Sequence, residues 1–191
     1  AQYDGLQYLQ ANVDGVHTAY VELVAEGADS EQVFRALSRK GFDLIFGGSF
    51  GYMDSMEVVA EEFPNIGYVH ISGYKANLKN FGNMFGEMET MKYLAGMLTG
   101  SRLKVDGCNK AGMMATFTIP EEFRLTNAYS LGLQATCPDC ELDVRWINTW
   151  HDPIIEREAA DSLFDAGACV VITGADTPAS ALAAADREGV W

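Results

Sequence analysis

Four short stretches of the chain carry residue types that could bind a small molecule. They are GGSFGYMD (47–54), TFTIPE (116–121), NTWHDP (148–153) and GADTPA (174–179). They supply aromatic rings, hydroxyl groups and carboxylates. Aromatic stacking contributes about 0.5–1.5 kcal/mol beyond area burial, and a carboxylate accepts hydrogen bonds from amines or hydroxyls. These groups suit a planar heterocycle. The candidate ligand-binding residues are Ser49, Phe50, Tyr52, Phe117, Trp150 and Asp176.

Each candidate also has a purely structural interpretation. Trp150 could be a buried core residue, and either Phe50 or Tyr52 could pack beneath its own loop. Asp152 precedes a proline and is better explained as a helix cap than as a ligand group. Asp176 could equally be a cap or a ligand contact.

Signals for an enzyme or a metal site are weak. The sequence has no GxSxG, HExxH or GxxxxGK[ST] motif. His17 and His70 fall within strand-like runs and are expected to be structural, while His151 has no partner at metal-ligand spacing. We therefore predict no catalytic residues, no metal and no cofactor. The alternative is an enzyme on a doubly wound α/β scaffold that acts on a phosphorylated or nucleoside substrate, with the glycines of GGSFG holding an anion.

The four cysteines do not form a zinc or thioredoxin-like motif. CPDC (137–140) has no second CxxC or histidine pair for zinc, and it follows a predicted helix rather than preceding one. Cys137 and Cys140 are expected to be loop residues. Whether one of them forms a disulfide with Cys108 is an open alternative. Cys169 is interpreted as a buried thiol. A disulfide would favour an oxidising compartment.

The composition describes a globular chain that is poorly suited to nucleic acid. The chain has 191 residues, 48% of them hydrophobic, and a net charge of −14 with only 13 lysines and arginines. A nucleic-acid-binding protein needs a basic face to neutralise phosphates, which this composition does not provide. No apolar run approaches the roughly 20 residues needed to cross a bilayer. The first residues show no signal-peptide pattern.

Helical and strand-like segments alternate along the chain. Helices are predicted over residues 1–12, about 29–40, 54–63, 87–100, 120–136, 153–166 and 178–188. Strands are predicted over residues 17–23, 42–46, 66–72, 110–117, 142–148 and 168–174, with weak strand character at 80–86. Asp29 or Ser30 is expected to cap the second helix, and Gly100 to end the fourth.

The alternation predicts parallel sheets covered by helices on both faces. The polar segment 101–109 is expected to cross between two lobes, so the lobes would comprise residues 1–104 and 105–191. The first helix has no strand before it, and the last residues resemble the start of a strand. On these grounds the chain is expected to be truncated at both ends.

Several motifs resemble the basic membrane protein family of substrate-binding lipoproteins, which are related to the purine nucleoside receptor PnrA. The resemblance extends over nearly the whole chain. It rests on SFGYMD (49–54), EEFPNIGYVHISGYK (61–75), FTIPEEFRLTNAYSLG (117–132), NTWHDPIIEREAADSLFDAGACVV (148–171) and GADTPASALAAADREGVW (174–191). The cysteines at 108, 137 and 140 depart from the family pattern.

The resemblance implies a two-lobed, doubly wound fold like that of type I periplasmic binding proteins, with a ligand in the cleft between the lobes. It implies a solute-binding protein, not an enzyme, that holds a purine base or nucleoside for ABC-type uptake or sensing. Trp150 would stack on the ligand. The implied partner is an ABC permease, and the implied location is extracytoplasmic, with a lipid anchor upstream.

Overall fold

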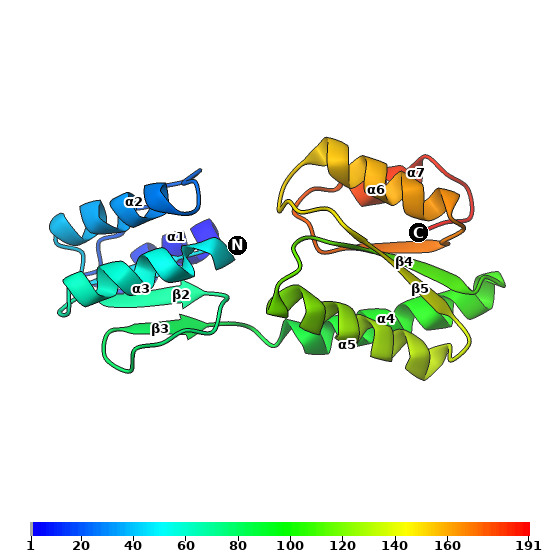
Figure 1. Cartoon of the computed structure of the whole chain (residues 1–191), viewed down its shortest axis with the longest axis horizontal. Helices are drawn as coiled ribbons and strands as arrows, with labels where there is room; N and C mark the ends of the chain where they lie inside the picture. Colours follow the sequence, from blue (N-terminus) through cyan, green and yellow to red (C-terminus); the bar gives the residue numbers. More distant parts are fainter. Residues whose placement is uncertain (1) are drawn as a thin grey trace. The chain divides into compact units, whose positions relative to one another are not determined.

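The computed structural model describes residues 2–191, which form two compact units. One unit ends at Gly86, and the second spans Glu87–Trp191. The expected boundary at residue 104 falls instead inside a helix of the second unit. Each unit has its own three-stranded sheet and its own hydrophobic core (Figure 1).

The first unit is a three-stranded parallel sheet with helices. Its elements are α1 (Gln2–Asn12), α2 (Ala28–Arg39), β1 (Leu44–Gly47), the short 3-10 helix η1 (Phe50–Tyr52), α3 (Met53–Glu62), β2 (Gly67–Ile71) and β3 (Phe81–Met84). The strand order is β1-β2-β3, with Ile45 opposite Tyr68 and Tyr68 opposite Phe81. The three side chains share one core with Phe34 of α2 and Met56 of α3.

One face of this sheet differs from the expectation of helices on both sides. Ile45 is buried beneath α2 and α3, whereas its neighbours Leu44 and Phe46 are half exposed on the opposite face. Successive side chains of a strand point to opposite faces, so burial that alternates along β1 indicates a single covered face.

Two further expectations for the first unit are wrong. Residues 17–23 form no strand, because their backbone groups join no ladder in the described part of the chain, and Leu23 has a positive φ of 58°. Gly27, rather than Asp29 or Ser30, precedes α2. The Ser30 hydroxyl points inward and contacts the Ser55 hydroxyl at 2.9 Å.

The second unit is a three-layer α/β structure. Its elements are α4 (Met88–Asp106), β4 (Lys110–Ala115), α5 (Pro120–Thr136), β5 (Glu141–Trp146), α6 (Pro153–Asp165), β6 (Val170–Thr173) and α7 (Ala179–Ala185). The strand order is β5-β4-β6, and both pairings are parallel. Helices α4 and α5 lie on one face of the sheet and α6 and α7 on the other (Figure 1). The predicted doubly wound arrangement is confirmed in this unit.

Helix α4 is longer than the sequence pattern predicted. It continues through Gly100 to Asp106 and ends at Gly107, whose φ of 69° is the left-handed conformation typical of a glycine helix stop. Residues 101–106, expected in a crossover, are therefore its last turns. Gly100 is buried against α5, where an added Cβ would lie 2.8 Å from the Leu133 carbonyl oxygen.

Glycines let α4 and α5 approach each other at backbone distance. A Cβ on Gly96 of α4 would overlap the carbonyl oxygen of Tyr129, and a Cβ on Gly132 of α5 would overlap that of Tyr93. The Tyr129 hydroxyl hydrogen bonds to the Thr99 hydroxyl at 2.9 Å across the same contact. Small residues at both crossing points are therefore a steric requirement.

We predict that Gly96→Ala destabilises the protein by about 1–3 kcal/mol, because the methyl group overfills the contact between the helices. Alanine is otherwise the better helix former by about 1 kcal/mol. Gly5→Ala is the matched control, since Gly5 lies in α1 with no atom near its added Cβ, and it should be neutral or stabilising. Urea unfolding of both variants tests this; a Gly96→Ala protein as stable as wild type would contradict it.

Candidate functional site

Three of the polar and aromatic stretches meet at one edge of the second sheet. Strands β4, β5 and β6 run in the same direction and end at Ala115, Trp146 and Thr173. The stretches TFTIPE and GADTPA follow β4 and β6 directly, and NTWHDP begins two residues after the end of β5. In open α/β sheets, ligands bind beyond the carboxyl ends of the strands. We call this the second carboxyl edge.

The structure brings together the three candidates of this edge. The rings of Phe117 and Trp150 lie with their centroids 4.9 Å apart and their planes tilted by 56°. The Asp176 amide donates to the Trp150 carbonyl oxygen at 3.0 Å, and the Asp176 side chain is exposed. Both rings are half-buried, so each keeps surface available for contact. Their role in ligand binding stays a prediction.

Asp152 is a helix cap, as predicted. Its Oδ1 accepts hydrogen bonds from the backbone amides of Ile154 at 3.0 Å and Ile155 at 3.1 Å. Pro153 occupies the first helical position, where no amide hydrogen is needed. The cap therefore sets where α6 begins and where the preceding loop must end.

A buried carboxylate that the sequence analysis missed joins two loops of this edge. Glu156 of α6 is 0% exposed. It accepts hydrogen bonds from the Asp152 amide at 3.1 Å, from the Thr177 amide at 3.2 Å and from the Thr177 hydroxyl. NTWHDP and GADTPA are thereby held together. The available signal was a glutamate four residues after the Asp152 cap.

A second buried carboxylate lies beneath the loops that follow β4 and β6. Glu122 of α5 is 2% exposed and accepts from the Thr116 amide at 3.1 Å. A Cβ on Gly174 would lie 2.9 Å from its Oε2, so only glycine fits there without displacement. Burial raises the pKa of the Glu122 carboxyl.

Lys92 of α4 adds a positive charge at the same edge. Its Nζ donates to the carbonyl oxygen of Thr173, the last residue of β6, at 3.0 Å. Burial lowers the pKa of the Lys92 ammonium, and the charge of Glu122 opposes this effect. The sequence pattern did not indicate Lys92, because only the fold brings α4 to the end of β6.

In the first unit, Ser49, Phe50 and Tyr52 follow the carboxyl end of β1. The Tyr52 ring packs edge-on against Phe34 with centroids 5.6 Å apart, and its hydroxyl donates to the Val24 carbonyl oxygen at 2.6 Å. Phe50 packs against the same core. All three candidates are half-buried, so the expectation that one aromatic packs under the loop applies to both.

His70 supports this loop from below and is structural, as predicted. It is 0% exposed, and its Nε2 lies 2.7 Å from the Ser49 carbonyl oxygen. Because a carbonyl oxygen only accepts, Nε2 carries the hydrogen. A Cβ on Gly73 would lie 2.5 Å from the imidazole ring, so the loop after β2 also closes over it. Burial lowers the pKa of His70.

The cysteines are paired, which corrects the interpretation of Cys169 as a buried thiol. Disulfides join Cys108 to Cys169 and Cys137 to Cys140. Cys108, Cys140 and Cys169 directly precede or lie next to the starts of β4, β5 and β6. Parallel strands bring these starts to one edge, which is how residues 61 apart in the chain can pair.

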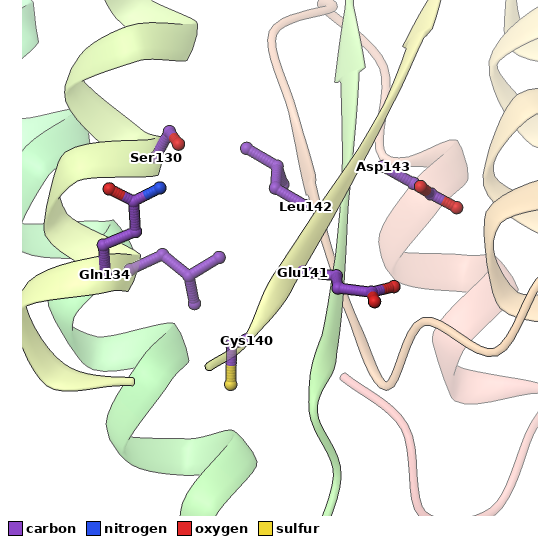
Figure 2. A pocket seen from close by; sticks show the side chains of 7 residues that line it. Ser130, Gln134, Cys140, Glu141, Leu142 and Asp143 are labelled. Carbon is purple, nitrogen blue, oxygen red and sulfur yellow. The ribbon is translucent and has the colours of Figure 1, made fainter. Parts of the chain in front are cut away.

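A cavity of about 440 Å³ lies between α5 and the start of β5, beside Cys140. Leu142 points toward Ser130 and Gln134, while Glu141 and Asp143 point to the other side of the strand (Figure 2). Its polar groups therefore do not converge. The cavity also lies at the amino end of β5, away from the second carboxyl edge.

Within residues 2–191, no three histidine, cysteine, aspartate or glutamate side chains are grouped so that they could hold a metal ion. No helix in this part of the chain is both long enough and apolar enough to span a membrane.

Ligands bind beyond the carboxyl ends of the strands in open α/β sheets of both enzymes and binding proteins, so the fold alone does not fix the class. The model of the PnrA-like ABC transporter substrate-binding proteins matches residues 1–189. The chain therefore belongs to this family, which comprises binding proteins rather than enzymes, as the motifs implied.

Two relatives are named as binding proteins but for different ligands. The chain is 40% identical to a Haloferax volcanii protein provisionally named an ABC transporter glucose-binding protein, over 97% of this chain and 46% of that one. It is 35% identical to a purine-binding protein of Brucella abortus, over 95% of this chain and 51% of that one. The chain thus spans about half the length of these relatives.

Solved structures show the same fold. A solute-binding protein of an ABC transporter system from Conexibacter woesei is 25% identical, with a TM-score of 0.70 over 97% of this chain and 61% of that one. A solute-binding protein from Aeropyrum pernix is 24% identical, with a TM-score of 0.75 over 85% of this chain and 48% of that one. The fold is that of periplasmic binding proteins, as expected.

We predict that Glu156→Ala lowers the free energy of unfolding by about 3 kcal/mol, because buried backbone amides lose a charged acceptor. Glu158→Ala on the exposed side of the same helix is the control and should change it by less than about 0.5 kcal/mol. Chemical denaturation provides the measurement. Equal stability of the two variants would show that Glu156 is dispensable.

We predict a stability that declines with acidity through His70. The folded state holds the pKa of His70 below its ordinary value of about 6.5. As the pH falls below that value, the unfolded chain takes up a proton at His70 before the folded protein does, and this favours unfolding. The free energy of unfolding should fall as the pH drops from about 7 toward 5. His70→Gln should flatten this decline, and the exposed His151→Gln should leave it unchanged. A His70→Gln protein with the wild-type pH profile would refute the assignment.

Proposed function

We propose that the protein is an extracytoplasmic solute-binding protein that holds a purine base or nucleoside for ABC-type uptake or sensing. The observation that carries the proposal is the Phe117–Trp150 ring pair, together with the exposed residue Asp176, whose backbone amide hydrogen bonds to the Trp150 carbonyl oxygen. Aromatic faces bind a flat heterocycle, and a carboxylate accepts from its amino group or from ribose hydroxyls. Ser49, Phe50 and Tyr52 are the proposed contacts of the first unit.

The second carboxyl edge suits binding better than chemistry. Its carboxylates Glu122 and Glu156 are buried and engaged by backbone amides, so they serve the loops rather than a reacting group. Function then depends on closure around the ligand. The proposed partner is an ABC permease, to which a loaded binding protein delivers its solute.

The disulfides support a location outside the cytoplasm. Cys108–Cys169 and Cys137–Cys140 account for all four cysteines. Such bonds form and persist in oxidising compartments and are rare in the cytosol. Anchoring by lipid stays an expectation from the resemblance.

The proposal predicts that at least one of adenine, hypoxanthine, guanosine and adenosine binds the protein. A ligand at 100 times its Kd should raise the free energy of unfolding by about 2.7 kcal/mol. Thermal shift and calorimetric titration measure this, with glucose as the comparison because one relative is provisionally named for it. If the protein binds glucose but none of the purines, the ligand is a sugar and not a purine. If it binds none of these compounds, the proposal is wrong.

The ring pair is tested separately. Trp150→Ala should weaken purine binding by about tenfold or more, because one stacking face is lost, while the melting temperature falls little. Trp191→Ala is the control, because Trp191 lies at the opposite edge of the sheet. Its backbone amide donates to the carbonyl oxygen of Cys169, beside the amino end of β6, at 2.8 Å. A collapse of the melting temperature in Trp150→Ala would make Trp150 a core residue.

A further inference from the structure

The Glu26 carboxylate lies against the loop that carries Ser49, Phe50 and Tyr52. Its Oε1 accepts hydrogen bonds from the Ser49 hydroxyl and from the Gly51 amide, the latter at 3.2 Å. A single carboxylate oxygen thus binds two donors of a loop that follows a strand at its carboxyl end. Two donors on one oxygen restrict the rotation of the carboxylate, which is otherwise free at an exposed glutamate.

Neighbouring contacts hold Glu26 in this position. The Val24 carbonyl oxygen accepts from the Tyr52 hydroxyl at 2.6 Å, which attaches the irregular segment to the same loop. An added Cβ at Gly51 would overlap the Glu26 carboxylate, so glycine is required for this approach. Burial and then the charge of Glu26 raise the pKa of the Tyr52 phenol.

The second oxygen of this carboxylate remains available. In the part of the chain that the structure describes, Oε2 of Glu26 accepts no hydrogen bond, and no lysine or arginine forms an ion pair with Glu26. The side chain is exposed. Glu26 is therefore an oriented acceptor with one occupied oxygen and one free oxygen beside the candidate ligand contacts.

We propose that Glu26 is a ligand-binding residue, whose free oxygen accepts a hydrogen bond from an N–H or O–H group of the ligand. The inference rests on the proposed function. It makes the Glu26 carboxylate the group of the first unit that favours ligands carrying a hydrogen-bond donor. A base amino group and a ribose hydroxyl share this chemistry. A ligand that offers only an acceptor at this point is repelled by the carboxylate.

Glu26→Gln separates this role from mere support of the loop. The amide oxygen of glutamine can still accept from Ser49 and Gly51, so the loop keeps both hydrogen bonds. The amide nitrogen replaces the free oxygen and turns an acceptor into a donor. Glu22→Gln is the matched control, because Glu22 is exposed in the same segment and has no hydrogen bond to residues 48–52 in the described chain.

The experiment is calorimetric titration of wild type, Glu26→Gln and Glu22→Gln with adenine, hypoxanthine, guanosine, adenosine and glucose. We expect Glu26→Gln to lose about tenfold or more in affinity, since a hydrogen bond to a charged acceptor is replaced by a donor facing a donor. Glu22→Gln should bind as wild type does, and the melting temperatures of all three proteins should agree.

The pattern across ligands identifies the donor. Loss with adenine and adenosine alike supports a base N–H, loss with adenosine alone supports a ribose hydroxyl, and loss with glucose supports a sugar hydroxyl. Unchanged affinity in Glu26→Gln overturns the inference while leaving the proposed function standing. Tighter binding also overturns it and makes Glu26 an internal competitor. A wild-type protein that binds none of the four purines and not glucose overturns both this inference and the proposed function.

Discussion

Parallel pairing of β4 with both β5 and β6 is the constraint on which the second carboxyl edge depends. Because all three strands run in one direction, the loops after them emerge side by side, and Phe117, Trp150 and Asp176 come together from distant parts of the chain. The same geometry brings the strand starts together at the other edge, where two disulfides lie. Parallel pairing therefore places the two disulfides at the amino edge of the sheet and the three candidate residues at the opposite, carboxyl edge.

Loops that crowd a sheet edge leave backbone amides in need of acceptors, and buried carboxylates supply them. An unsatisfied buried donor costs about 1–3 kcal/mol, so the Glu122 and Glu156 carboxylates offset several such costs at the expense of their own desolvation. Each accepts from the loops it underlies. The result is a set of loops whose backbone the fold itself holds in place, and loops that are already fixed lose less entropy in any binding event.

Much of this architecture was predictable because it depends on local chemistry. Most strands and helices are where apolar periodicity and proline positions indicated, and the Asp152 cap is as its sequence context implied. The errors have a common cause. Residues 17–23 have strand-forming side chains but no neighbouring strand in the described chain, and Gly100 lies in a helix because tertiary packing overrides a glycine's tendency to end one. Secondary-structure propensity is a local property, so it cannot predict which other segment of the chain a given segment packs against.

The amino-acid sequence alone determined the class of fold, the family and the four stretches whose residue types suit ligand binding, because these depend on patterns within short windows. Only the tertiary structure decided which residues support those stretches. Lys92, Glu122 and Glu156 become parts of the second edge through contacts between separate elements, and Glu26 meets Ser49 across 23 residues of chain. A buried or oriented carboxylate has the same letter as an exposed one, and the difference between them arises only from what the folded chain places around it.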